Sequence, residues 1–134
     1  MKFICNYRVI YADTDAMGVV YHSNYFKWFE MGRVEYLRSL GIPYKEIEEK
    51  GFSLPVVTAY CKYVKPAKYD DLLRIETSFV EIKRASIKIY YEIFLENNGV
   101  ELVNGYTMHA LTDRDGKIKR IPDFIIDKIT PIVR

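Results

Sequence analysis

One long, mostly apolar helix followed almost entirely by strands is the feature that most limits what this chain can fold into. Residues 24–40 contain no proline and one internal glycine, and the stop signals Gly41 and Pro43 follow. We therefore expect a helix there. Apolar side chains cover a broad arc of this helix. Arg33 falls on that arc, where a charge should have a carboxylate partner.

Two-residue alternation of apolar and polar side chains predicts strands on both sides of the helix. The expected strands cover residues 3–11, 52–65, 73–79, 87–93 and 100–113. Pro55 places the start of the second strand at a sheet edge or a bulge. A short amphipathic piece, residues 44–50, comes before it. Asn97-Asn98-Gly99 predicts a hairpin with a primed turn, and tight turns between consecutive strands require an antiparallel sheet.

These elements predict an α+β fold in which a strongly curved antiparallel sheet wraps around the single long helix. The 134 residues are expected to form one domain, residues 1–134, because no repeat and no Gly-, Ser- or Pro-rich linker divides them. A hydrophobic share of 49% is enough for a core of that size.

Charge, hydropathy and cysteine usage exclude several classes of protein. The formal net charge of +2 is too small to predict a nucleic-acid partner. No apolar run approaches the ~20 residues of a membrane helix, and residues 1–7 lack a signal-peptide pattern. We therefore expect a cytoplasmic protein with no integral membrane segment. Cys5 and Cys61 have no CxxC spacing and are expected to be reduced thiols.

The densest polar cluster lies between the first strand and the helix. Asp13 and Asp15 are separated by one residue, and turn or cap chemistry is the plainest role for them. Gly18 lets the backbone approach a ligand closely. The unpaired N–H groups of the helix start could then bind an oxyanion or a phosphate. For His22 a backbone role at this start is favoured over a general base or a surface histidine. His109 is expected to be structural, and no third ligand completes a metal site.

The same segment resembles a known family. Residues 11–25, YADTDAMGVVYHSNY, and residues 29–37, FEMGRVEYL, closely resemble the signature of hotdog-fold acyl-CoA thioesterases of the 4-hydroxybenzoyl-CoA thioesterase class. They look closest to the bacterial branch encoded near the Tol-Pal envelope system, and the resemblance covers almost the whole chain. It implies the hotdog fold and an enzyme that hydrolyses a thioester to a free carboxylic acid and CoA.

The resemblance also implies roles for individual residues. Asp15 matches the family's catalytic carboxylate, which acts as nucleophile or as general base on water. The backbone N–H of His22 matches the oxyanion donor. Gly18, Val19 and Tyr21 fall where the family contacts its substrate. The resemblance implies no metal and no cofactor, since CoA is part of the substrate.

A second group of residues is expected at the CoA phosphates. Lys83 and Arg84, followed by Ser86, match a basic stretch of the family, although an ordinary charged bend would look the same. Arg120 is a weaker candidate of this kind, and Glu30 is a weak alternative base. The expected partners are an acyl-CoA substrate and further copies of the chain, in a dimer or a dimer of dimers. That makes a homotetramer the larger assembly.

Two other functions compete with this one. Residues 9–15, VIYADTD, also look like the opening of haloacid-dehalogenase-like phosphatases, but that fold needs parallel strands alternating with helices. A non-catalytic acyl-CoA or lipid-binding hotdog module would share the fold expected here. Asp15 favours the enzyme over the binding module, because an unpaired carboxylate beside an acyl pocket would weaken binding.

Overall fold

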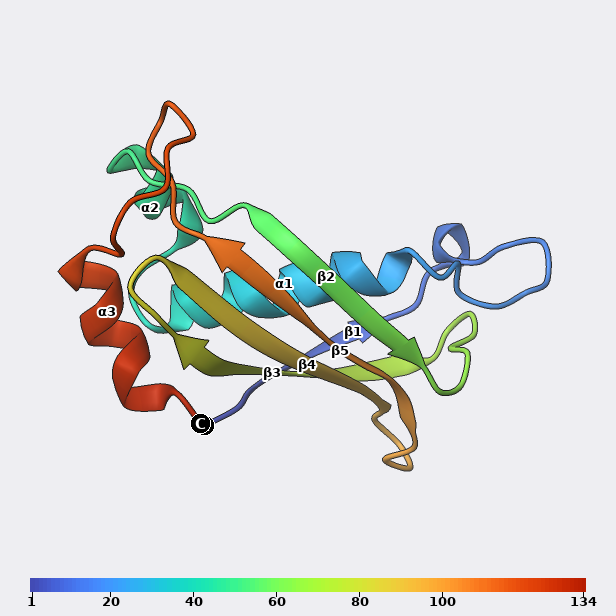
Figure 1. The fold of residues 1–134 in the computed structure, drawn as a ribbon. Coiled ribbons are helices and arrows are strands. Elements are labelled where there is room, and N and C mark those ends of the chain that lie inside the picture. Colours follow the sequence, from blue (N-terminus) through green and yellow to red (C-terminus); the bar gives the residue numbers. More distant parts are fainter.

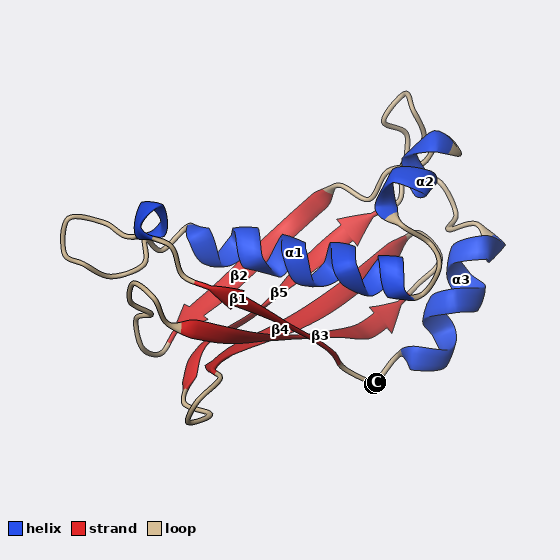
Figure 2. Cartoon of the chain, turned by 180° about the vertical axis from the view of Figure 1, so that it is seen from behind, coloured by secondary structure: helices blue, strands red, loops and turns tan.

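Five antiparallel strands form one curved sheet, and a single 16-residue helix lies along it (Figures 1 and 2). The computed structural model describes residues 1–134. Its strands are β1 (Phe3–Arg8), β2 (Val56–Tyr63), β3 (Leu72–Ile82), β4 (Ser86–Leu95) and β5 (Glu101–Ala110). They are ordered β1-β3-β4-β5-β2 across the sheet, and the helix is α1 (Asn24–Ser39). The hotdog arrangement predicted from the sequence is confirmed.

Close packing of α1 on the sheet comes from large aromatic side chains and one glycine. Trp28 and Phe29 are fully buried, and the Phe29 ring stacks on Tyr91 of β4 with 4.3 Å between centroids. At Gly32 a Cβ atom would overlap Oγ1 of Thr77 on β3. Only glycine at this position lets the helix lie so near the sheet.

The shorter elements differ in part from the sequence expectations. The helix α2 (Tyr44–Glu49) is confirmed, whereas α3 (Asp123–Ile129) was not predicted. The first strand ends at Arg8 rather than at residue 11. Beyond it the chain turns into a short 3-10 helix, η1 (Tyr11–Asp13), and a second one, η2 (Thr130–Ile132), follows α3.

The hairpin between β4 and β5 is confirmed, but its primed turn was a wrong prediction. Gly99 has a positive φ of 71°, while Asn97 and Asn98 do not. The Leu95 carbonyl accepts the Gly99 N–H at 2.9 Å, and the Leu95 N–H donates to the Val100 carbonyl. These bonds close a four-residue loop, in which one left-handed residue is enough.

The strand β2 is a free edge of the sheet. It pairs only with β5, and a bulge between Val56 and Thr58 interrupts its register, as Pro55 predicted. Nearly all of β2 is exposed on both faces, including Val57 at 61%. An edge strand with exposed apolar side chains is a template for pairing with another chain.

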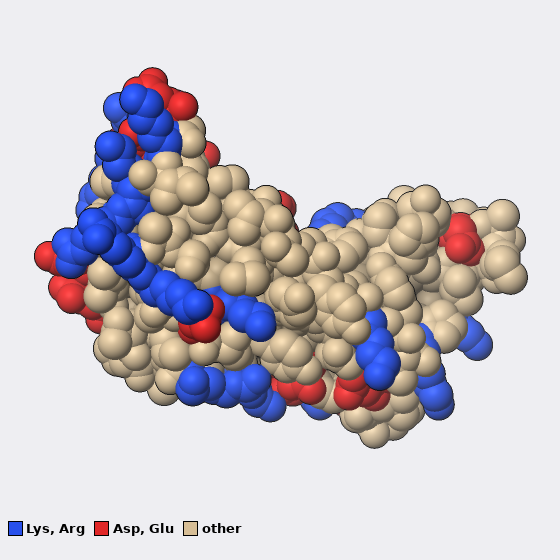
Figure 3. Space-filling model, in the orientation of Figure 1, with Lys and Arg blue, Asp and Glu red and all other residues tan.

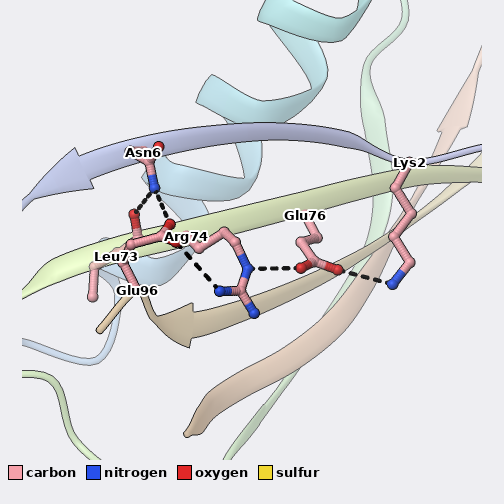
Figure 4. Close-up of polar contacts among 6 residues, drawn as sticks. All are labelled: Lys2, Asn6, Leu73, Arg74, Glu76 and Glu96. Carbon is pink, nitrogen blue, oxygen red and sulfur yellow. Dashed lines mark hydrogen bonds and ion pairs between the residues drawn. The ribbon is translucent and has the colours of Figure 1, made fainter. Parts of the chain in front are cut away.

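Ion pairs stabilise the opposite edge of the sheet, where β1 pairs with β3 (Figure 4). Glu76 accepts hydrogen bonds from Lys2 at 2.9 Å and from Arg74 at 2.8 Å, and Arg74 continues to Glu96 at 3.5 Å. Asn6 Nδ2 donates to Glu96 and to the Leu73 carbonyl. This network ties β1 to β3 and to the end of β4. No helix of the structure has the length and apolar character needed to cross a membrane.

Candidate active site

The two aspartates of the loop before α1 have different environments. Asp13 is buried, and its carboxylate accepts hydrogen bonds from the Tyr7 hydroxyl at 2.8 Å, the Ile10 N–H at 3.0 Å and the Lys27 ammonium at 2.8 Å. Burial alone would raise the pKa of Asp13. Its three donors outweigh that effect, so the pKa lies below the ordinary value. Asp13 therefore holds the loop in place as a fixed anion.

Asp15, by contrast, keeps one oxygen free. Its Oδ1 accepts the N–H groups of Met17 at 2.8 Å and Val19 at 3.4 Å, in a turn closed by its own side chain. No group of the chain donates to Oδ2 within hydrogen-bond distance. Asp15 is half-buried on the loop between β1 and α1, and Figure 1 shows that loop at one end of the molecule. A held carboxylate with one free oxygen has the geometry of a nucleophile or a general base.

The start of α1 lies directly beside this loop. The Asp13 carbonyl accepts both the Tyr21 N–H at 2.9 Å and the Asn24 side-chain amide at 2.8 Å. The backbone N–H groups of His22 and Ser23 have no acceptor within the chain. Free N–H groups at a helix start can stabilise negative charge.

The other residues expected here surround the same helix start. Gly18 is exposed and has a φ of +80°, and Val19 bridges to Lys68. The exposed His22 ring packs on Tyr21. Tyr63 of β2 was not identified from the sequence, and its hydroxyl donates to the His22 carbonyl at 3.2 Å.

Lys83, Arg84 and Ser86 lie at the other end of the protomer. The β1–β3 register pairs Arg8 with Leu72, so the Asp15 loop adjoins the start of β3. Lys83 and Arg84 follow the end of that 11-residue strand, about 30 Å away along it. A single protomer therefore does not bring the expected CoA-binding residues to Asp15.

Further cations gather around Lys83 and Arg84. The Arg84 carbonyl accepts the Ile121 N–H at 2.8 Å, which brings the loop before α3 against the β3–β4 turn. That loop carries exposed Lys119 and Arg120. Figure 3 shows Lys and Arg concentrated at this end of the molecule. The sequence singled out Arg120 but not Lys119, whose proximity depends on the fold.

A buried hydrogen-bond chain crosses the sheet behind α1. The Tyr91 hydroxyl bonds to Thr107 Oγ1 at 2.7 Å, Thr107 bonds to His109 Nε2 at 2.7 Å, and His109 Nδ1 bonds to the Leu54 carbonyl at 2.9 Å. Since Nδ1 must donate to that carbonyl, Nε2 accepts. Burial lowers the pKa of His109 to about 4. The ring is thus fully bonded, and the structural role expected for it is supported.

Arg33 faces the same region from α1. Its guanidinium is mostly buried, and it pairs with Glu30 one turn earlier at 3.8 Å. The carboxylate partner expected for Arg33 is therefore present, although Glu30 itself is exposed.

Comparisons with known proteins identify the family of this chain. The family model described as the thioesterase-like superfamily matches residues 9–129. The acyl-CoA thioesterase YbgC of Haemophilus influenzae is 41% identical over 115 residues, which cover 85% of this chain and 82% of that protein.

Solved structures support the fold. The crystal structure of a hypothetical protein from Thermus thermophilus superimposes with a TM-score of 0.93 at 30% identity, covering 100% of this chain and 99% of that one. A 4-hydroxybenzoyl-CoA thioesterase mutant in complex with 4-hydroxybenzoyl-CoA has a TM-score of 0.86 at 23% identity, covering 96% and 98%. At that identity the second likeness supports the fold alone.

Proposed function

Because this chain belongs to the thioesterase-like superfamily and is an acyl-CoA thioester hydrolase, we propose that Asp15 is its catalytic carboxylate and that the start of α1 is its oxyanion site. One observation carries the assignment. Asp15 is held by two backbone N–H groups through Oδ1 alone, beside a helix start whose His22 N–H is free. Asp13 has no free carboxylate oxygen, because three donors bind the two oxygens.

The chemistry follows from this arrangement in one of two ways. In the first, Asp15 Oδ2 attacks the thioester carbonyl, the C–S bond breaks, CoA leaves as thiolate, and water hydrolyses the resulting anhydride. In the second, Asp15 takes a proton from water, the hydroxide attacks the carbonyl, and the thiolate leaves. In both routes negative charge develops on the carbonyl oxygen, where the free N–H of His22 stabilises it. In a single turnover in ¹⁸O-labelled water, label in the Asp15 carboxylate and none in the acid product identify the first route, with water attacking the anhydride at the Asp15 carbon. In the base route the label enters only the acid product.

We further propose that the complete site forms between two copies of the chain. The β2 edge is exposed and apolar, and two copies can pair there antiparallel about a two-fold axis. Such pairing sets the end of one protomer that carries Lys83 and Arg84 toward the Asp15 end of its partner. The separation within one protomer supports this assembly, and stacked pairs would give the tetramer.

The basic end is proposed to hold the CoA phosphates. CoA brings several negative charges to a protein whose net charge is only +2, so a local cluster must attract it. Lys83 and Arg84 supply charge, Ser86 can add a hydrogen bond, and Lys119 and Arg120 extend the cluster. Nothing in the proposed chemistry uses a cofactor besides the CoA of the substrate. A cytoplasmic location is proposed from the two free thiols, Cys5 and Cys61.

Mixed dimers test the shared site. We consider one variant with Asp15→Asn and another with Lys83→Ala and Arg84→Ala, each nearly inactive at substrate concentrations below the wild-type KM. In a mixed dimer the intact Asp15 of the second variant meets the intact cations of the first, so one wild-type site is restored. Recovery of up to half the wild-type kcat/KM per mixed dimer is expected. No recovery in a purified mixed dimer would contradict a site shared between copies.

A further inference from the structure

Three hollows follow one another along α1, the first two of them between α1 and β2. The first is lined by His22 and Tyr63 at the helix start. The second is lined by Phe26 and Ala59, and the third reaches Leu37 near the end of the helix. The hollows thus mark a track that begins at the proposed oxyanion site and follows most of α1.

The third hollow, here called the α1 cavity, is the part of this track with an apolar interior. Its volume is ≈ 370 Å³. Glu30 and Arg33 line both this cavity and the second hollow, so they form the rim between the two. Beyond the rim the lining is mainly aliphatic and aromatic. These wall residues include Val34, Leu37, Leu54, Phe79, Ile87 and Ile89.

The one histidine of the cavity wall, His109, has no ring nitrogen left to bond to an occupant of the cavity. Both ring nitrogens of His109 are already bonded, to Thr107 and to the Leu54 carbonyl. Its lowered pKa keeps the ring neutral at pH 7. The interior past the rim therefore offers an apolar occupant no desolvated charge to bury.

We propose that the α1 cavity receives the end of the substrate's acyl group, so that the preferred substrates are straight-chain acyl-CoAs of about twelve to sixteen carbons. This inference rests on the proposed function. A methylene occupies close to the ~30 Å³ share of a liquid water, so the cavity has ample room for the last few carbons of such a chain. An acetyl or a benzoyl group would leave most of this apolar space empty.

The length of the track sets which acyl chains reach the α1 cavity. From Asn24 to Val34 the helix rises about 15 Å. An extended hydrocarbon advances about 1.3 Å per carbon, as follows from C–C bonds of about 1.5 Å, so about twelve carbons span that distance. A shorter chain would stop at the charged rim formed by Glu30 and Arg33, without reaching the apolar interior.

Chain-length profiles of the wild type are the direct test. Hydrolysis of straight-chain acyl-CoAs of two to twenty carbons, and of benzoyl-CoA, is followed with a thiol-trapping reagent. We expect kcat/KM to rise about three- to fourfold for each added carbon that enters the apolar interior, to peak between twelve and sixteen carbons, and then to fall. A maximum at acetyl-CoA or benzoyl-CoA would overturn the inference alone. Failure to hydrolyse any CoA thioester would overturn the proposed function as well.

A substitution in the wall ties the profile to this cavity. Val34 is only half-buried, so Val34→Phe should fold while taking space from the chain. The ratio of kcat/KM for tetradecanoyl-CoA over butanoyl-CoA should fall about tenfold. Val34→Met is the milder replacement if the first variant has a lowered Tm. Val100→Phe, the same change at the β4–β5 turn, should keep the wild-type ratio. An equal loss at every chain length in both Val34 variants would contradict the assignment.

Discussion

Lys27 Nζ lies 2.8 Å from Asp13 Oδ1 and joins the first turn of α1 to the loop that carries Asp15. The side chain of Asp13 is 3% exposed and that of Lys27 is 50% exposed, so one partner is buried and the other reaches water. The pair fixes the loop relative to the helix start. The free oxygen of Asp15 and the free N–H of His22 thereby keep a constant relative position.

The two aspartates should respond in opposite ways to the same substitution. Asp15→Asn is expected to lower kcat by roughly 10²–10⁴-fold and to leave the free energy of unfolding unchanged, because its charge acts in the reaction. Asp13→Asn should instead lower that free energy by about 1–2 kcal/mol, because the buried pair with Lys27 is lost, and should reduce kcat less. Steady-state kinetics measure kcat of both variants, and urea unfolding measures their free energies of unfolding. Full turnover of Asp15→Asn together with loss in Asp13→Asn would reverse the assignment.

Substitution of both cations at the β3–β4 turn should affect binding rather than chemistry. Lys83→Ala combined with Arg84→Ala is expected to raise KM for acyl-CoA with kcat nearly intact, since the phosphates lie far from the reacting carbonyl. Raising the salt concentration should increase the wild-type KM and change that of the variant much less.

The controls for this prediction use a shorter substrate and a distant pair of cations. An acyl-pantetheine thioester lacks the nucleotide and should be hydrolysed equally well by variant and wild type. Lys2→Ala with Arg8→Ala removes the same charge at the β1 edge of the sheet and should leave KM unchanged. Equal KM values for acyl-CoA in the Lys83 and Arg84 variant and the wild type, at low and high salt, would make the turn an ordinary charged bend.

Stability should depend on pH through His109. Its pKa is lowered to about 4 in the folded protein and is about 6.5 when unfolded. The unfolded chain therefore takes up a proton before the folded chain does, and stability is lost as the pH falls from about 6.5 toward 4. Between pH 7.5 and 5 this loss should be about 2 kcal/mol. Urea unfolding across that range should show it, and His109→Gln should flatten the dependence. An equally steep dependence in that variant would assign the effect to other groups.

At Gly32 the effect of an alanine substitution on packing should outweigh its effect on helix propensity. Alanine for glycine inside a helix usually stabilises by about 1 kcal/mol. At Gly32 the added Cβ meets Thr77 Oγ1, so Gly32→Ala should destabilise by about 1–3 kcal/mol. Adding Thr77→Ala removes the obstructing atom and should restore part of the loss, which a double-mutant cycle of unfolding free energies measures. Independent, additive effects would argue against the contact.

Local sequence pattern was enough to predict the long helix, the number of strands and an edge or a bulge at the start of β2. Each depends on residues close in sequence, such as the stop at Gly41 or the break at Pro55. The same reasoning missed α3, whose seven residues are too few to show a clear helical period. The four-residue turn at Gly99 was not predicted either, because the backbone hydrogen bonds between β4 and β5 set the length of that loop.

Long-range contacts account for what the sequence could not show about the site. In the sequence Asp13 and Asp15 look alike, and only the packing of Tyr7 and Lys27 around Asp13 distinguishes them. The distance between Lys83 and Asp15 depends on the direction of β3. Likewise, the α1 cavity is lined by side chains from α1, β3, β4 and β5, which no spacing in the sequence brings together.

The place of β2 in the sheet also affects the folding of the chain during its synthesis. β5 is its only neighbour within the chain, and it is the last strand to leave the ribosome. Until then β2 has two open edges, with Val57 and Tyr60 exposed. A nascent or truncated chain that ends before Glu101 should therefore self-associate through this strand. Lys62, inside the strand, and Lys65 and Lys68, just after it, supply the like charges that delay such pairing.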